Sequence, residues 1–186
     1  MAPADWSGLS LAVGVSLAQS LQPQLPAEGE DRARLGLKWP NDLWLEGDRK
    51  LGGILIETAS GVGPSRYVVI GVGLNVRAPA GEGLSTTPAG LRDIDPLLDA
   101  PTALGRIVAP LVQALLAFEQ YGFAPVRSQF AERDLLQGRS VNLSDGQGGV
   151  AQGVGADGAL RVQTAGGLRA VTSSDISVRP QSVPLN

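Results

Sequence analysis

Lys38 is the residue whose chemical type fits its surroundings least well. It lies within an apolar run typical of a β-strand, where an ammonium group is costly unless it meets an anionic ligand or an acidic partner. Pro40 then removes a backbone donor, and Asn41 and Asp42 favour a change of direction. Lys38 therefore either serves a functional site at this turn or extends its ammonium group to solvent at the end of a strand.

Two more strand-like runs carry residues that suit a binding site. Gly52 and Gly53 interrupt the first of them, which indicates either a β-bulge or a place where a ligand approaches the backbone. Asn75 closes the second, where its amide either reads the edge of a base or caps the strand. The glycines before Asn75 do not complete a dinucleotide-binding fingerprint, because its sixth position is Val76 and no helix is predicted to follow.

Composition excludes several kinds of chemistry. The chain has 186 residues with no His and no Cys, which excludes a Ser-His-Asp triad, a thiol nucleophile, a disulfide framework and a zinc site of the usual kind. Its 15 basic and 18 acidic residues give a net charge of −3, which argues against nucleic acid as the main partner because phosphate binding needs clustered cations. Catalysis must therefore use lysine, arginine, carboxylates, asparagine, hydroxyls or backbone groups.

Hydrophobic periodicity predicts two main helices. The first covers residues 8–22, with Ser7 as its N-cap, and is apolar nearly all round, so we expect other elements to cover it on several sides. The second covers residues 102–121, with Thr102 as its N-cap. No apolar run reaches the ~20 residues that a membrane-spanning helix needs. The chain is therefore predicted to be soluble and cytoplasmic, with no membrane partner.

Strand patterns fall into two groups. The first group is a set of three longer runs before residue 77, the first two joined by a turn around Gly47 and Asp48: 35–47, 49–60 and 66–76. From about Gly138 the pattern changes to short strands of period two, separated by turns such as Asp145-Gly146 and Asp157-Gly158. Five strands in about fifty residues predict a small SH3-like barrel that packs on the preceding domain.

Three segments taken together resemble the central motifs of bacterial biotin protein ligases. In matching order and spacing, they are Lys-Trp-Pro-Asn-Asp-Leu at 38–43, Arg-Lys-Leu-Gly-Gly-Ile-Leu-Ile-Glu at 49–57, and Ile-Gly-Val-Gly-Leu-Asn-Val at 70–76. The resemblance implies an α+β fold with a central mixed β-sheet and flanking helices, like that of class II aminoacyl-tRNA synthetases and biotin ligases, followed by an SH3-like barrel. The implied domains are a truncated catalytic domain at 1–135 and the barrel at 136–186.

The resemblance also implies an activity. Biotin and ATP, with Mg²⁺, would form biotinyl-5′-adenylate, and the biotinyl group would pass to a lysine of the biotin carboxyl carrier protein of acetyl-CoA carboxylase. No tightly bound prosthetic group is expected, and the enzyme would form a homodimer through strands of its sheet. The implied site residues are Lys38 as the catalytic and biotin-binding group, Gly52 and Gly53 for biotin, Asn41 and Asn75 for the nucleotide, and Asp42 as a candidate Mg²⁺ ligand.

One departure from the family pattern leaves alternatives open. An upstream half of the family's catalytic domain carries a Ser-Thr-Asn element and a Gly- and Arg-rich loop that closes over the adenylate, and neither is present here. The expectation is that the chain begins just after that half. The main alternative to an active ligase is therefore a non-enzymatic fragment that needs the upstream half, and a lipoate or octanoate ligase is a third reading. The helix-turn-helix of family members that double as repressors is also lacking, so no DNA role is inferred.

Overall fold

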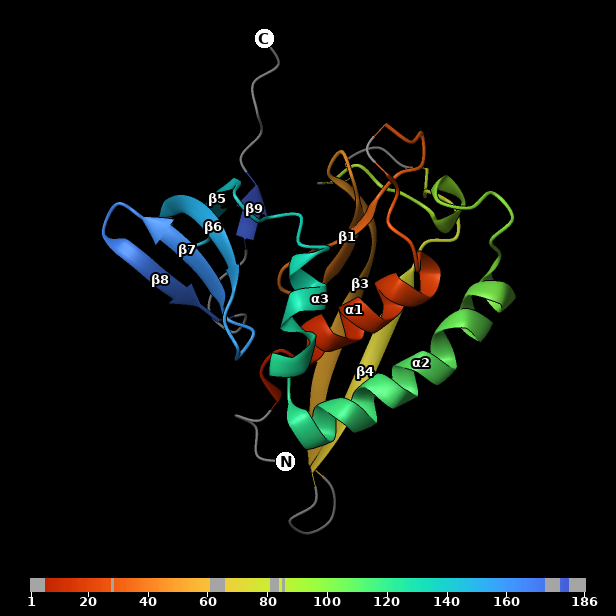
Figure 1. Ribbon diagram of the computed structural model, residues 1–186, viewed down its shortest axis with the longest axis horizontal. Coiled ribbons are helices and arrows are strands. Elements are labelled where there is room, and N and C mark those ends of the chain that lie inside the picture. The colour runs from red at the N-terminus through yellow and green to blue at the C-terminus, as the bar shows by residue number, and fades with distance from the viewer. Residues whose placement is uncertain are drawn as a thin grey trace.

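The computed structural model describes residues 6–27, 29–60, 66–80, 84, 86–172 and 178–180. Two antiparallel sheets lie side by side, with helices against the first (Figure 1). The first sheet has the order β1 (Leu35–Lys38), β2 (Asp42–Leu45), β3 (Arg49–Ser60) and β4 (Arg66–Leu74). The predicted α+β class is confirmed, but these four strands pair only antiparallel, so the mixed pairing implied by the resemblance is not found among them.

Two long helices cover one face of this sheet: α1 (Leu9–Leu21) and α2 (Ala100–Tyr121) (Figure 1). The predicted burial of the first helix is confirmed, because ten of its thirteen residues are buried. Both predicted N-caps are wrong. Gly8 caps α1 in a left-handed conformation, while the Ser7 hydroxyl donates to the carbonyl of Asp157, and Asp99 caps α2 by accepting from the backbone N–H of Thr102.

The run at 35–47 is two strands, and not the single strand that the sequence predicts. The chain turns back between Lys38 and Asp42, so β1 pairs with β2, and the turn at Gly47 and Asp48 then joins β2 to β3. The turn forms at Pro40, which has no N–H for a ladder, and Asn41 holds it by donating its side-chain amide to the carbonyl of Ile54 at 2.8 Å. The Trp39–Pro40 peptide bond is cis.

Short elements connect the two sheets: η2 (Leu91–Asp93), η3 (Ala124–Val126) and α3 (Arg127–Ala131). The second sheet follows in the order β8 (Gly167–Val171), β7 (Leu160–Thr164), β6 (Gly148–Val154), β5 (Ser140–Leu143) and β9 (Val178–Pro180). Its five strands agree with the number predicted. Arg139 joins the sheets by donating two hydrogen bonds to the Asp48 carboxylate, at 2.6 and 2.7 Å, and these bonds lower the pKa of Asp48.

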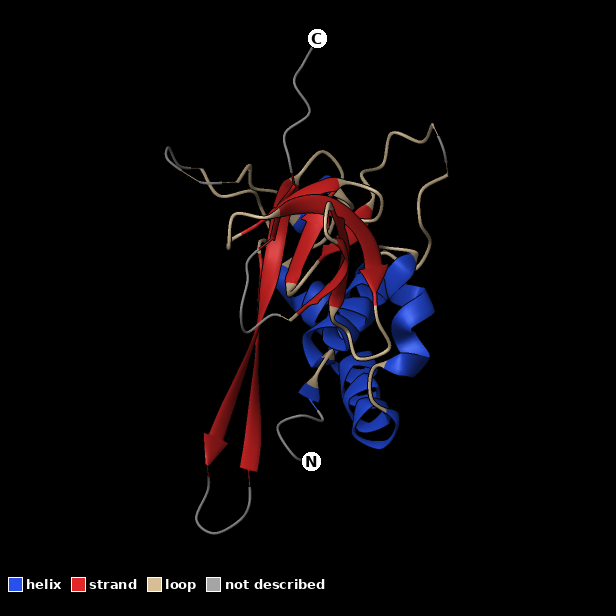
Figure 2. Cartoon of the chain, turned by 90° about the vertical axis from the view of Figure 1, so that its left-hand side faces the viewer, coloured by secondary structure: helices blue, strands red, loops and turns tan. Residues whose placement is uncertain are grey.

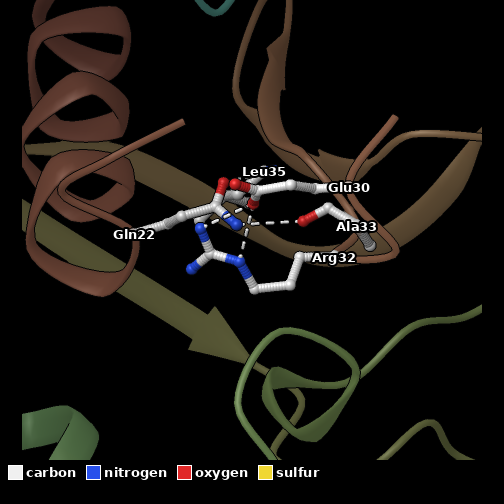
Figure 3. A network of polar contacts seen from close by, with 5 residues as sticks. All are labelled: Gln22, Glu30, Arg32, Ala33 and Leu35. Carbon is white, nitrogen blue, oxygen red and sulfur yellow. Dashed lines mark hydrogen bonds and ion pairs between the residues drawn. The ribbon is translucent and has the colours of Figure 1, made fainter. Parts of the chain in front are cut away.

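A buried polar network fixes the end of α1 to the start of β1. The side-chain amide of Gln22 donates to the carbonyl of Ala33 at 2.9 Å and accepts from the N–H of Leu35 at 2.8 Å (Figure 3). Arg133, which is 3% exposed, donates to the carbonyl of Leu35 at 3.1 Å and to that of Gln22 at 2.6 Å. The segment after α3 is therefore built into the first sheet, because its backbone also bonds with β1.

The helix α2 differs from the sequence expectation about membrane spans. It has 22 residues and a mean hydropathy of 1.4 over an 18-residue window, which is long and apolar enough to cross a membrane by length and composition alone. The sequence reading required an unbroken apolar run, which Pro110 and Gln113 interrupt. In the fold, α2 packs along α1 and buries Ala103, Ile107 and Phe118. Most of the helix is exposed, including the large apolar side chains of Leu104, Val108, Val112 and Leu116.

The hairpin of β3 and β4 reaches far beyond the other strands of its sheet (Figure 2). Apolar side chains along it are exposed to solvent, with Leu55 at 57%, Tyr67 at 60% and Val69 at 53%. The opposite face of the sheet is the one that meets the helices, because a side chain at Gly14 of α1 would contact Leu37 and Ile54. The sheet therefore has one covered face and one open face.

Candidate functional site

A row of residues crosses the first sheet, one from each strand. The strand registers pair Lys38 with Asp42, Asp42 with Gly53, and Gly53 with Gly73. Residues paired across antiparallel strands share a face, and alternation places this row opposite Leu37 and Ile54, which meet α1. The row therefore lies on the open face, with two charged side chains at one end and two positions without side chains at the other.

Lys38 is the last residue of β1, and its side chain is 10% exposed. Its ammonium nitrogen lies 3.9 Å from Oδ2 of Asp42 and 5.0 Å from the centre of the Trp44 ring. A carboxylate and an aromatic face offset part of the cost of withdrawing an ammonium group from water. These two neighbours explain how a strand of apolar residues holds a charged side chain. Lys38 is the first residue of the row that crosses the sheet.

Lys50 joins the same cluster and was not singled out in the sequence. Its Nζ lies 2.7 Å from Oδ1 of Asp42, so one carboxylate stands between two ammonium groups. The three charges sum to about +1, which favours an incoming anion. Only the strand register brings Lys50 to this cluster. A bulge between β2 and β3 pairs Lys50 with Trp44, while Gly52 pairs with Leu43.

Asp42 does not fit the role of magnesium ligand. Its two oxygens face the ammonium groups of Lys50 and Lys38. Among the described residues, no group of three or more Asp, Glu, His or Cys side chains is placed to hold a metal ion. Mg²⁺ prefers six oxygen ligands in an octahedron, often including waters and the phosphates of a bound nucleotide. These residues therefore supply no protein-built magnesium site.

The two adjacent glycines have different surroundings. A Cβ at Gly52 would lie 2.2 Å from the carbonyl oxygen of Gly73, so the backbones of β3 and β4 approach too closely for any side chain. A Cβ at Gly53 would lie 3.2 Å from Oδ1 of Asp42 and 3.8 Å from Nζ of Lys50. Gly52 therefore permits the strand pairing, whereas the lack of a side chain at Gly53 lets the Asp42 carboxylate lie close against the backbone of β3.

Both asparagines hold loops next to the sheet. The side-chain amide of Asn41 donates to the carbonyl of Ile54, and the backbone carbonyl of Asn41 accepts from the N–H of Ile54 at 2.8 Å. Asn75 donates its side-chain amide to the carbonyl of Ala89 at 3.1 Å, and its backbone N–H donates to the carbonyl of Leu51 at 3.0 Å. Asn75 directly follows β4 and is two residues beyond Gly73, so alternation places it on the same face of the sheet as Gly73. Nucleotide binding by either asparagine remains a prediction.

Asp134 lies on the segment that pairs with β1 at Leu37. One carboxylate oxygen accepts from the N–H of Leu136 at 2.8 Å, while the other is buried and has no hydrogen-bond partner among the described residues. Burial raises the pKa of Asp134 to about 6, because a carboxylate with one unmatched oxygen loses more hydration than its neighbours return. The folded chain therefore binds this proton more tightly than the unfolded chain.

This shift predicts a pH dependence of stability. Since the folded-state pKa lies above the unfolded value, Asp134 costs stability progressively as pH rises from about 4 to about 6. Asp134→Asn removes the titration, so its stability relative to the natural chain should improve by about 2–3 kcal/mol between pH 4 and pH 7.5. Urea unfolding of both proteins at the two pH values measures the change. The same difference in unfolding free energy between the two proteins at pH 4 and at pH 7.5 would contradict the prediction.

Two family models match segments of this chain, and one of them contains the row of residues across the first sheet. Residues 2–75 match the model of the biotin/lipoate A/B protein ligase family, and residues 137–179 match that of the biotin protein ligase C-terminal domain. The chain belongs to the biotin protein ligase family. The first match contains Lys38, Asp42, Lys50 and both strands that supply the glycine row, so the site lies within the part that defines the family.

Two named relatives show how much of a biotin protein ligase is represented. The chain is 34% identical over 187 residues to the bifunctional ligase/repressor BirA of Escherichia coli, covering 95% of this chain and 54% of the relative. It is 33% identical over 178 residues to the biotin–[acetyl-CoA-carboxylase] ligase of Mycobacterium tuberculosis, covering 92% and 62%. The chain thus spans little more than half the length of these curated relatives.

Solved structures of biotin protein ligases share the fold. The biotin protein ligase of Aquifex aeolicus aligns with a TM-score of 0.78 at 22% identity, covering 95% of this chain and 76% of that one. The same enzyme in complex with biotin and ATP aligns with a TM-score of 0.77 at 22% identity, covering 94% and 72%. The arrangement of sheets and helices is therefore the family's.

Proposed function

We propose that this chain forms the part of a biotin protein ligase that activates biotin with ATP and transfers it to a carrier lysine. The observation that carries the proposal is the row across the sheet, in which Lys38 and Lys50 flank Asp42 beside Gly53 and Gly73. A ligand with an anionic end and a compact, neutral body fits such a row. The carboxylate would meet the ammonium groups, and the rings would lie over the glycines.

In the first step, an oxygen of the biotin carboxylate attacks the α-phosphorus of ATP. A new bond joins this oxygen to phosphorus, the bond from the α-phosphorus to the bridging oxygen breaks, and pyrophosphate leaves. Two anions must approach one another, so a fixed ammonium group between them reduces their repulsion and stabilises the charge that grows on the phosphoryl oxygens. Lys38 would supply this group, because Asp42 and the Trp44 ring hold it at the end of β1.

In the second step, the carrier's lysine amine attacks the carbonyl carbon of the mixed anhydride. A carbon–nitrogen bond forms, the bond to the adenylate oxygen breaks, AMP leaves and the amine loses a proton. Lys50, with 43% of its side chain exposed, would attract the anionic adenylate at the outer side of the cluster. The acceptor would be a biotin carboxyl carrier domain, and we propose a cytoplasmic location, which cell fractionation tests.

The decisive experiment is the intact mass of a biotin carboxyl carrier domain after incubation with the chain, biotin and MgATP. We expect a gain of one biotinyl group, and parallel reactions with lipoate and octanoate in place of biotin should give none. A gain only with lipoate or octanoate would assign the chain to that class of ligase. No gain, together with no measurable binding of biotinyl-adenylate, would favour a non-enzymatic fragment.

Association between copies is a separate prediction. Among the described strands of the first sheet, β1 is partly covered by its backbone bonds with the 133–135 segment, whereas β4 is the open edge, and such an edge presents unpaired backbone groups to another chain. We expect the purified chain to be dimeric or prone to aggregate. Light scattering measures this directly, and a monodisperse monomer at micromolar concentration would refute it.

A further inference from the structure

The residue directly after Lys38 is bonded to the second sheet. Trp39 is 2% exposed, and its indole Nε1 donates to the carbonyl of Gly158 at 3.0 Å. Gly158 lies in the turn between β6 and β7, which is 119 residues further along the chain. The second sheet thus contacts the proposed catalytic strand at the position next to its lysine, through a buried hydrogen bond.

The same turn also lies directly against the start of α1. A Cβ at Gly158 would lie 2.7 Å from Cα of Gly8 and 3.1 Å from its nitrogen, and Gly158 itself has a φ of +79°. The hydroxyl of Ser7 donates to the carbonyl of Asp157. The turn of the second sheet is therefore in close backbone contact with the residue that caps α1.

The start of α1 in turn holds the other end of the Lys38 turn. The hydroxyl of Ser10 donates to the carbonyl of Pro40 at 2.9 Å. Residues of α1 and of the 37–42 segment, including Lys38, line one small pocket. Trp39 and Pro40 are thus held from two sides, and the Asp157-Gly158 turn contacts both of the segments involved.

We propose that the Asp157-Gly158 turn is a positioning element for Lys38. It acts through Trp39 and through the start of α1, and it touches no reacting atom. The proposal rests on the proposed function of Lys38, and it gives the second sheet a role in the first chemical step. A shift of the Lys38 ammonium group by a fraction of an ångström would misplace it relative to both anions, and such shifts lower rates steeply.

A pair of matched variants tests this role. Asp145-Gly146 is a second Asp-Gly turn in the same sheet, with a φ of +86° at Gly146 and no atom within 4 Å of a Cβ placed there. Gly146→Ala and Gly158→Ala therefore introduce similar backbone strain, but only Gly158→Ala pushes against Gly8. Trp39→Phe is the third variant, since it removes the indole donor and keeps an aromatic ring.

We expect Gly158→Ala and Trp39→Phe to lower kcat for adenylate formation by about 10- to 100-fold, with a smaller change in the KM for biotin. Gly146→Ala should stay within about twofold of the natural chain, because its strain is not transmitted to Lys38. A loss of the same size in Gly146→Ala, or natural kcat in both Gly158→Ala and Trp39→Phe, would overturn the proposal. Trp39→Phe keeps the test open if Gly158→Ala does not fold.

Amide hydrogen exchange separates this inference from the proposed function. In Gly158→Ala and Trp39→Phe, exchange should accelerate at residues 38–43 while residues 160–164 of β7 stay protected. This readout needs no turnover, so it stands even if the natural chain forms no adenylate, which would overturn the proposed function alone. Unchanged exchange at 38–43, or an equal rise across both sheets, would overturn the positioning role.

Discussion

Lys38→Met is expected to lower the rate of biotinyl-adenylate formation by about 10²- to 10³-fold, or roughly 3–4 kcal/mol in the barrier. The methionine keeps much of the side-chain length and volume but removes the charge that would lie between the two anions. Asp42 retains Lys50 at 2.7 Å, so the substitution does not strand a buried carboxylate. Pyrophosphate release with biotin and MgATP measures the rate, and a thermal melt verifies that the fold is retained.

Two companion variants sharpen this test. Lys50→Met should have a smaller effect that shrinks further at high salt, because its side chain is 43% exposed and screening weakens its attraction. Arg32→Met removes an exposed cation whose ion pair is with Glu30 and not with Asp42, and it should leave the rate unchanged. Equal rates for Lys38→Met and Arg32→Met would remove Lys38 from the mechanism.

Gly52→Ala is expected to give the largest loss of stability, about 3 kcal/mol. The added methyl group would lie 2.2 Å from the carbonyl oxygen of Gly73 and 2.9 Å from Cδ2 of Leu74. The first of these atoms is backbone, so relief requires β3 and β4 to separate where Gly52 pairs with Leu74. For a chain of this length, the loss corresponds to a fall in Tm of roughly 6–12 °C.

Gly73→Ala is the matched control for this effect. Gly73 lies on the facing strand, and a Cβ there would have only the Gly53 carbonyl oxygen nearby, at 4.0 Å. Its Tm should therefore stay within a few degrees of the natural value. Thermal unfolding of both variants decides the matter, and a Gly52→Ala protein that melts with the natural chain would show that the two strands can move apart without cost.

How far the sequence predicts this fold depends on the range of the interactions involved. Local patterns predict α1, the turn at Gly47 and Asp48, and the change to short strands after Gly138, because helical periodicity and turn residues act within a few positions. The change of direction at Pro40, Asn41 and Asp42 is also predicted from the turn residues, but the pairing of β1 with β2 across it is missed, since apolar residues continue on both sides and make 35–47 look like one strand. The two N-caps are missed because the helices begin at Gly8 and Asp99 instead.

The site shows the same division. Lys38 is identifiable as a charge placed within an apolar strand, and the adjacent glycines as an interruption of another. Lys50 is not identifiable in this way, because a lysine next to a turn is ordinary and only the register of β2 and β3 brings it to Asp42. The separate surroundings of Gly52 and Gly53 likewise depend on which backbone atoms face them, and sequence spacing does not contain that information.

The buried guanidinium of Arg133 has a consequence for the order of events during synthesis. It bonds to the carbonyls of Leu35 and Gln22, at separations of 98 and 111 residues along the chain. A nascent chain that has released α1 and all four strands of the first sheet still lacks this partner. The Trp39 indole waits longer, until Gly158 has emerged. Contacts of such long range slow folding, so the first sheet cannot mature from its N-terminal end, and the lysine turn becomes fixed only after Gly158 has been synthesised.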